Sequence, residues 1–285
     1  MDFTLDEQQQ AVVDLAEQIF GDALAPDLQT ERLRVVENTD EWFDRDLWQV
    51  LADAGLLGIA LSDDVGGAGL DAVALALLLR AQGAHVAPMP LLPSAVASLV
   101  VDRHGDDSQR QALLPGVVAG TTILTVAIQE LLDDRLSKPS CSFMVEPSNG
   151  RPTGRLTGRK VVVEHLGVAH HLLVTASTVD GPRVVLVDRS SEGIAAQTGP
   201  STRLQPLSDV TFTDVPGQVV GGPAAVTALL DHLRMGVCAT QHVHGGMGVA
   251  TDYPLHRYTL WNKHLATSLG AGNQALRGLG ALLAD

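Results

Sequence analysis

The feature that most constrains this chain is a change of sequence pattern at Thr121, followed by a second change at Pro223. Before Thr121, apolar residues recur with helical spacing. From 121 to 222 they form short β-branched runs separated by Gly, Pro, Ser and Asp, which is typical of strands joined by turns. No helix-length segment separates these runs, so we expect a mainly antiparallel sheet. The order predicts an α+β fold with an N-terminal helical domain (1–120), a central β domain (121–222) and a C-terminal helical domain (223–285).

Start and stop signals place the first helices. Thr4 and Glu7 in "TLDE" match a capping box and predict the start of the first helix. A second helix is predicted in "DRDLWQVLADAG", where Gly55 is a natural stop. Its apolar face is expected to contain Leu47, Val50, Leu51 and Ala54.

The next run, "LDAVALALLLRAQG", is apolar on nearly every side and predicts a helix buried all round. Two more helices are expected over roughly 93–102 and 108–119. Pro223 suits the first turn of a later helix, which we expect to end at Gly245. One apolar stripe follows this helix: Val226, Leu229, Leu230, Leu233 and Val237.

Charge and apolar runs exclude several classes of protein. The formal net charge is −14, whereas nucleic acids and anionic membranes bind basic surfaces, so neither is expected as the main partner. The longest apolar run, over 72–79, is too short to span a bilayer, and "MDFTLDEQQQ" is unlike a signal peptide. Cys141 and Cys238 form no disulfide framework and no CxxC motif. These features predict a cytoplasmic protein.

The stretch "HVHGGMG" is the strongest local candidate for a site, and it allows three interpretations. His242 and His244 could bind a metal, but a single HxH pair without a carboxylate or cysteine partner is weak evidence. Gly245, Gly246 and Gly248 could let backbone amides approach a phosphate. Taken alone, the stretch is most simply a glycine corner after a helix.

Four stretches in order resemble the acyl-CoA dehydrogenase family. They are "LWQVLADAGLLGIALSDDVGGAGL", "GDDSQRQALLPGVVAG", "GRLTGRKVVVEHLGVAHHLLVTA" and the "HGGMG" that precedes "DYPLHRY". Within the third, Leu156, Gly158 and Lys160 match the family's "LxGxK" signature. The resemblance extends along most of the chain.

The resemblance implies an FAD cofactor between the β domain and the C-terminal helices, with the glycine corner of a neighbouring subunit at its ADP portion. It also implies α,β-desaturation of a CoA thioester, in which a carboxylate removes the α proton and the flavin accepts a hydride. The cofactor-binding residues implied are His242, His244, Gly245, Gly246, Gly248, Gln129 and Glu130.

The family's catalytic glutamate has no counterpart here. The corresponding stretch is "TSLGAGNQ", which places Leu269 or a neighbour at that position, and no carboxylate side chain lies between Tyr253 and Ala284. Leucine cannot accept a proton. We therefore assign no catalytic residue and no metal ligand to this chain.

The strands expected to face the flavin also differ from the family pattern. The stretch "AIQELLDDRL" keeps Glu130 but has Gln129 in place of a threonine. Val162 and Glu164 occupy the places of an aromatic residue and a threonine. Either glutamate could also be an ordinary charge at a strand end or sheet edge.

The C-terminal helical region is short for the family. It has 63 residues (285 − 222), roughly 80 residues and about two helices fewer than the bundle that the family builds there. The protein could be naturally reduced, or the sequence could join two stretches across a gap.

Loss of the base is a feature of one branch that the chain resembles, the actinobacterial steroid side-chain dehydrogenases. These are α2β2 heterotetramers in which one subunit carries the glutamate. The resemblance implies that this chain is the base-lacking subunit, with FAD at the interface and an acyl-CoA, possibly of a steroid side chain, as substrate. The alternative is a flavin-free scaffold or regulatory relative.

Overall fold

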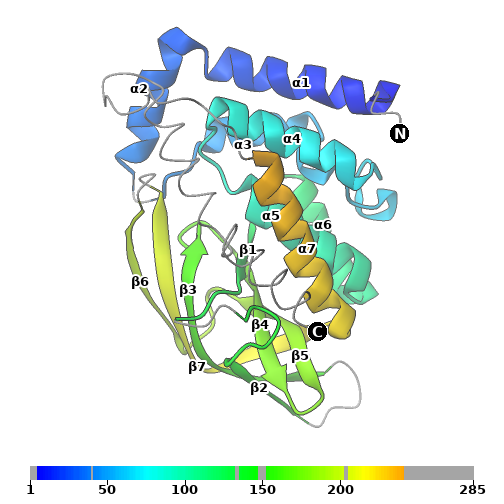
Figure 1. Cartoon of the computed structure of the whole chain (residues 1–285), viewed down its shortest axis with the longest axis vertical. Coiled ribbons are helices and arrows are strands. Elements are labelled where there is room, and N and C mark those ends of the chain that lie inside the picture. Colours follow the sequence, from blue (N-terminus) through cyan, green and yellow to red (C-terminus); the bar gives the residue numbers. More distant parts are fainter. Residues whose placement is uncertain (1–4, 40, 132–134, 147–151, 202–204, 241–285) are drawn as a thin grey trace, which may run out of the picture.

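The computed structural model describes residues 5–39, 41–131, 135–146, 152–201 and 205–240. Helices gather on one side of the molecule and the strands on the other, and the last described helix returns to the helical side (Figure 1). This is the α+β arrangement predicted from the change of pattern at Thr121. The helices are α1 (Glu7–Ala23), α2 (Pro26–Glu37), α3 (Arg45–Asp53), α4 (Ala72–His85), α5 (Leu91–His104), α6 (Asp107–Val118) and α7 (Pro223–Thr240), with short 3-10 turns at Leu56–Gly58 and Asp63–Val65.

The first helix begins later than the sequence predicted. Asp6 is its N-cap, and the capping box joins Asp6 to Gln9: the Gln9 N–H donates to Oδ1 of Asp6 over 2.8 Å, and the Asp6 N–H donates to Oε1 of Gln9 over 3.2 Å. The predicted Thr4–Glu7 box was therefore wrong by two residues. Aspartate caps as well as threonine does, so the overlapping pattern "DEQQ" satisfied the same requirement. The helix α2 was not predicted.

Two predicted helix faces also need correction. Val50 in α3 and Ala54, the residue that caps its C-terminus, are exposed, because Trp48 and Ala52 join Leu47 and Leu51 on the buried face. In α4 one side faces solvent, with Val73 47% exposed, so this helix is not buried all round. Among the described helices, α5 is buried along most of its length, from Leu91 to Val101 apart from Leu92, and it packs against α6, α7 and the strand β1.

In the part of the chain that the structure describes, seven strands form one sheet, mostly antiparallel as predicted. They are β1 (Leu124–Ala127), β2 (Ser142–Val145), β3 (Thr153–Glu164), β4 (His171–Thr178), β5 (Gly181–Asp188), β6 (Ile194–Pro200) and β7 (Pro206–Val220). The strands β2 and β6 were not predicted, and β1 runs parallel to β4. Because β4 pairs with both β2 and β5, and β7 joins β3 to β5, the sheet closes on itself.

Two hydrophobic clusters hold the molecule together. One joins the helices to the helix-facing residues of the sheet, and the other fills the interior of the sheet. The stripe predicted on α7 is buried at Val226, Leu229, Leu230 and Leu233, where α7 packs on α4, α5 and β5. The predicted end of this helix at Gly245 lies outside the described residues. None of the described helices is long and apolar enough to cross a membrane.

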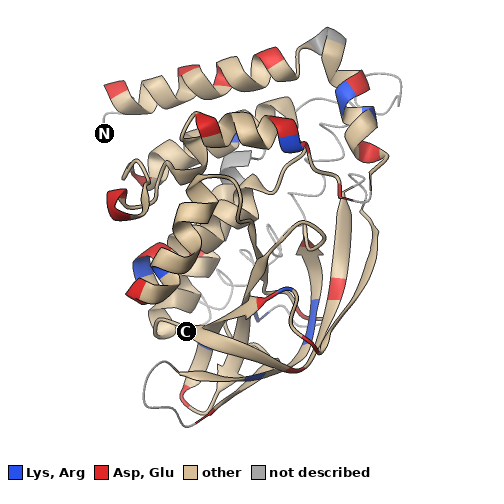
Figure 2. Ribbon diagram, turned by 180° about the vertical axis from the view of Figure 1, so that it is seen from behind, with Lys and Arg blue, Asp and Glu red and all other residues tan. Residues whose placement is uncertain are grey.

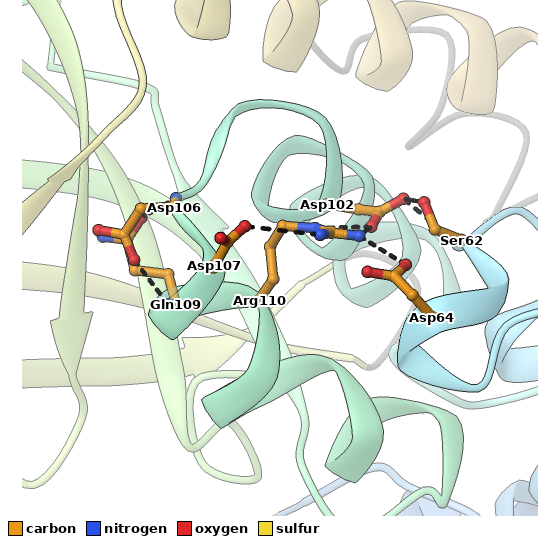
Figure 3. A network of polar contacts seen from close by, with 7 residues as sticks. All are labelled: Ser62, Asp64, Asp102, Asp106, Asp107, Gln109 and Arg110. Atoms are coloured by element: carbon orange, nitrogen blue, oxygen red, sulfur yellow. Dashed lines mark hydrogen bonds and ion pairs between the residues drawn. The ribbon is translucent and has the colours of Figure 1, made fainter.

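A polar network ties α5 and α6 to the turn that follows α3 (Figure 3). Arg110 donates to Asp64 over 2.7 Å and to Asp102 over 3.1 Å, and Asp102 accepts from the hydroxyl of Ser62 over 2.7 Å. Gln109 donates to the carbonyl of Val219 over 3.1 Å, which links α6 to β7. The network therefore fixes the helical layer to the sheet.

Charge on the helical layer is mainly acidic. The helix α1 carries Glu7, Asp14, Glu17 and Asp22, all of them exposed, and no basic residue. Figure 2 shows acidic positions and no basic ones along this helix. Such a surface does not attract polyanions.

Candidate functional site

The described part of the candidate site lies on β3 and on the segment that follows β1. The motif "LTGRK" occupies the middle of β3, and each of its three signature residues has a separate structural reason. Leu156 is fully buried in the interior of the sheet. Gly158 has a φ of +146°, and a Cβ there would lie 2.5 Å from Sγ of Cys141. Only glycine allows β3 to approach Cys141 this closely.

The third signature residue, Lys160, places a buried ammonium group inside the sheet. Its Nζ donates to Oε1 of Glu130 over 2.7 Å, to Oγ1 of Thr175 over 3.0 Å and to the carbonyl of Ile128 over 3.3 Å. These three acceptors match the three donors of an ammonium group. Burial lowers the pKa of Lys160, an effect that Glu130 opposes.

The carboxylate of Glu130 is fully engaged within the chain. Besides Lys160, it accepts hydrogen bonds from the hydroxyl and backbone N–H of Ser140, over 2.6 and 2.7 Å, and from the N–H of Cys141 over 2.9 Å. Burial alone would raise the pKa of Glu130, but these donors outweigh it and lower the pKa to about 2. Such a group is a poor base. It holds segment 139–141 against β3, and a direct contact between Glu130 and a cofactor stays a prediction.

The neighbouring thiol is inert for a related reason. Burial raises the pKa of Cys141 to about 11, so the thiol stays protonated at neutral pH. Its Sγ lies 3.4 Å from the carbonyl of Arg159. Cys141 is thus a small packing residue at the contact with Gly158.

A β-bulge follows Lys160 on β3. Lys160 pairs with Val210 and Val163 with Ser208, so Val161 and Val162 on β3 stand opposite the single residue Asp209 on β7. Val162 has a φ of 58°, which is a left-handed conformation that β-branched residues rarely adopt. Its side chain is 37% exposed, and bulges of this kind re-aim side chains near sites.

The bulge joins Gln129 to the strand that carries the motif. The N–H of Val161 donates to the carbonyl of Gln129 over 2.9 Å, because the bulge turns this N–H away from β7. Gln129 is half-buried. The structure therefore brings together Gln129, Glu130 and the end of β3, which the sequence predicted as separate parts of one site.

The remaining predicted cofactor residues lie outside the described part of the chain. They are His242, His244, Gly245, Gly246 and Gly248. Among the described residues, no group of three or more His, Cys, Asp or Glu side chains is arranged to hold a metal ion.

Sequence reasoning missed the partners of the buried ion pair, which are Ser140, Cys141 and Thr175. One signal was present. Leu156, Gly158 and Lys160 alternate along a strand and so point to the same face, which Leu156 identifies as the core face. A lysine on that face requires a buried acceptor, and Glu130 is the only carboxylate in the segment after β1 that the family pattern retains.

A groove of about 450 Å³ lies elsewhere, beside α2 and the start of α3. Its main charges are paired: Arg32 contacts Asp44 through both oxygens, and Arg45 contacts Glu41 over 2.8 Å. These pairs give the groove a structural explanation, and none of the predicted site residues lines it.

Comparisons with known proteins match the chain along its length. The family model described as "Acyl-CoA dehydrogenase, N-terminal domain" matches residues 6–121. The acyl-CoA dehydrogenase FadE27 of Mycobacterium tuberculosis is 26% identical over 385 residues, covering 100% of this chain and 99% of that protein. The alignment exceeds this chain by 100 positions (385 − 285), so FadE27 contains residues without a counterpart here.

Solved structures extend the likeness to the whole fold. One described as "Tcur3481-Tcur3483 steroid ACAD G363A variant" has a TM-score of 0.87 and 33% identity, over 99% of both chains. The ChsE4–ChsE5 complex of Mycobacterium tuberculosis has a TM-score of 0.83 and 24% identity, over 100% of this chain and 99% of that one.

Proposed function

This chain belongs to the acyl-CoA dehydrogenase family, and we propose that it is a base-lacking subunit of an FAD-dependent enzyme that desaturates a CoA thioester. A partner subunit of the same family supplies the catalytic glutamate in an α2β2 assembly. The proposal rests on two facts taken together: the structural match and the missing base. The chain matches a two-component steroid ACAD over 99% of its length, yet no carboxylate side chain lies between Tyr253 and Ala284.

The described residues fit an FAD site at the end of β3. The bulge leaves the apolar side chain of Val162 partly exposed, and Gln129, which is half-buried, is bonded through its backbone carbonyl to the adjacent Val161. An apolar surface with a few placed polar groups is what a ring-shaped cofactor requires. We assign Gln129 to the ring side, with Glu130 shaping this segment. His242, His244, Gly245, Gly246 and Gly248 are assigned to the phosphate side.

When bound, FAD would supply the acceptor for a hydride from the β carbon of the acyl chain. The residues of this chain contribute binding and orientation. The Lys160–Glu130 pair holds the segment after β1 against β3, and the bulge fixes the direction of Val162. Removal of the α proton is assigned to the partner, because Glu130 with a pKa of about 2 is a poor base.

The substrate class follows from the relatives rather than from this chain's own pocket. The matched structures include complexes described as steroid ACADs, and we propose a bulky acyl-CoA, such as one with a steroid side chain. Activity assays test the subunit roles. The chain alone should not oxidise acyl-CoA, the complex should, and Glu→Gln at the partner's base should abolish turnover. Full activity of this chain alone would contradict the proposal.

A flavin-free scaffold is the second candidate, and one observation favours it. Val162 and Glu164 stand where the family pattern has an aromatic residue and a threonine, so two expected contacts to the ring differ here. An anionic side chain opposes the negative charge that a flavin gains on reduction. Co-purification of the chain with a partner but without flavin would favour this second candidate.

A further inference from the structure

Three residues with a left-handed backbone, Trp42, Val162 and His165, lie at the end of β3 and in the loop that packs on it. We call this region the corner; it adjoins Gln129 and Glu130, the segment proposed to meet the cofactor. Among the described residues, five that are not glycine have a positive φ. Three of them belong to this corner: Trp42 with 46°, Val162 with 58° and His165 with 53°. Bulky and β-branched residues adopt this conformation at a cost, and they keep it only where their surroundings determine it.

The corner joins two parts of the chain that are far apart in sequence. Trp42 lies between α2 and α3, and His165 follows β3 directly. Their rings are 6.0 Å apart between centroids, at 45° to each other, and the two residues are 4% and 3% exposed. Each left-handed residue therefore points its ring into a shared, buried contact.

Both ends of this contact are held by hydrogen bonds. The N–H of Trp42 donates to the hydroxyl of Thr39 over 3.2 Å. The carbonyl of His165 accepts from the N–H groups of Val168 and Ala169, over 3.2 and 3.1 Å. The turn after β3 is thereby closed on itself and pressed against Trp42.

The corner is connected to Gln129 through the bulge. His165 lies three residues after Val162, and the bulge is what directs the Val161 N–H to the Gln129 carbonyl over 2.9 Å. On the other side, the hydroxyl of Thr125 donates to the carbonyl of Glu164 over 2.7 Å. The end of β3 is therefore fixed between β1 and Trp42.

We infer that Trp42 and His165 are positioning residues, which lock the Val162 bulge and so hold Gln129 and the end of β3 in the orientation that receives FAD. This inference rests on the proposed function. The physical effect is preorganisation. The bulge already has its final conformation before the cofactor binds, so binding does not have to order this edge of the sheet. Neither ring needs to touch the cofactor.

Substitutions that remove what restrains the bulge, while still allowing its backbone conformation, test this directly. Val162→Gly places glycine where φ is positive, and His165→Asn keeps a residue that tolerates the left-handed region while removing the ring. Asp214→Gly is the matched control, since Asp214 has a φ of 54° in β7 but its side chain is 74% exposed and lies on another strand. All three changes suit the backbone, so the variants should fold.

Two measurements are made on each variant. Hydrogen exchange of the Val161 amide, on the chain alone, should be about tenfold faster in Val162→Gly and His165→Asn than in wild type. Glycine at 162 has access to many other backbone conformations, and asparagine at 165 lacks the ring that holds the turn against Trp42, so the bulge opens more often. In the complex with the partner, both variants should lose FAD about tenfold faster, while the melting temperature of the chain changes by no more than about 3 °C. Asp214→Gly should match wild type in both the exchange of Val161 and the retention of FAD.

The outcomes separate this inference from the proposed function. If the wild-type complex holds FAD and both variants hold it equally well, the positioning role is wrong and the proposed function stands. If Val161 exchanges at the wild-type rate in both variants, the role is also wrong. A wild-type complex that contains no FAD contradicts the proposed function, and the positioning role with it.

Discussion

The helical layer and the sheet of this chain are stabilised in different ways. In the helical layer α5 is buried along most of its length among apolar side chains. The buried carboxylate of Asp102, 4% exposed, is paired with Arg110, which is 17% exposed (Figure 3). In the sheet, an ammonium group is fully buried beside a carboxylate, and the strained residues Val162 and His165 lie close by. Buried charge and backbone strain reduce stability unless they are compensated, so a place where both occur together is a candidate site. A positive φ alone is not enough, since Val86 at the end of α4 also has one, of 51°.

The largest effect should come from breaking the buried ion pair of the sheet. Lys160→Met leaves the Glu130 carboxylate buried without its cation, and we expect a loss of about 3–5 kcal/mol in unfolding free energy. The double variant Lys160→Met/Glu130→Gln should be less destabilised than the single one, as measured by urea unfolding. Equal losses in the two variants would show that the charge itself is not what matters.

A cavity in the enclosed helix is the matching test for the helical layer. Leu99 in α5 is 1% exposed, and Leu99→Ala should cost about 2–5 kcal/mol through lost burial and an unfilled cavity. The loss in Leu99→Ala should not be reduced by removing a charge elsewhere, whereas Glu130→Gln should reduce the loss caused by Lys160→Met. Rescue by a nearby larger apolar side chain would support this reading, and a loss under about 1 kcal/mol would contradict it.

The polar network of Arg110, Asp102 and Ser62 in the helical layer should contribute less to the unfolding free energy than either of these. Asp102→Asn keeps the size of the side chain but weakens its bonds to Arg110 and Ser62, and we expect a loss of about 1–2 kcal/mol. Thermal unfolding of this variant beside wild type measures the effect. A loss of helical circular dichroism in the folded variant would contradict this expectation, because it would mean that the network determines whether α6 forms.

The smallest effect is a dependence on pH at the contact between α5 and α7. Nδ1 of His232 donates to the carbonyl of Ala228 over 2.6 Å, and Nε2 lies 3.3 Å from Nη1 of Arg103, so the ring must be neutral to accept from arginine. Burial lowers the pKa of His232, and the positive charges of Arg103 and His104 act in the same direction, while Ala228 and Asp231 oppose them.

A lowered pKa means that this contact stabilises the protein fully above the unfolded pKa of 6.5 and that the contribution is lost as pH falls through the folded value. The melting temperature should therefore fall between pH 7.5 and pH 5.5 by less in His232→Gln than in wild type. The Glu130 pair should not contribute to this difference, because the pKa of Glu130 is about 2 and its contribution is lost only as pH falls below about 4.5. An identical fall in melting temperature in the two proteins would show that His232 does not cause the pH dependence.

Sequence patterns predicted the architecture because apolar periodicity decides which element a segment forms. The stripe on α7 and the stop at Gly55, which has a φ of 74°, are confirmed for this reason. Details that depend on neighbouring elements were not accessible. The exposure of Val50 and the enclosure of α5 follow from which elements pack against them, and β6 has an almost wholly exposed pattern that gives no alternation.

The candidate site was predictable only in part. Glu130 was selected because it matches a family pattern, and Gln129 because it stands in the place of that pattern's threonine; the structure places both beside β3. The contact between Trp42 and His165 could not be predicted, since it joins residues 123 positions apart (165 − 42) and depends on backbone strain that no local pattern encodes. Strain of this kind becomes visible only once the chain is folded.

The most direct test of the central claim is the flavin content of the chain with and without its partner. We would co-express this chain with an acyl-CoA dehydrogenase subunit that carries the glutamate, purify the complex and measure its flavin absorbance against protein concentration. We expect about one FAD per pair of unlike subunits and none on this chain alone. A stable complex without flavin, or a full complement of FAD on this chain by itself, would contradict it.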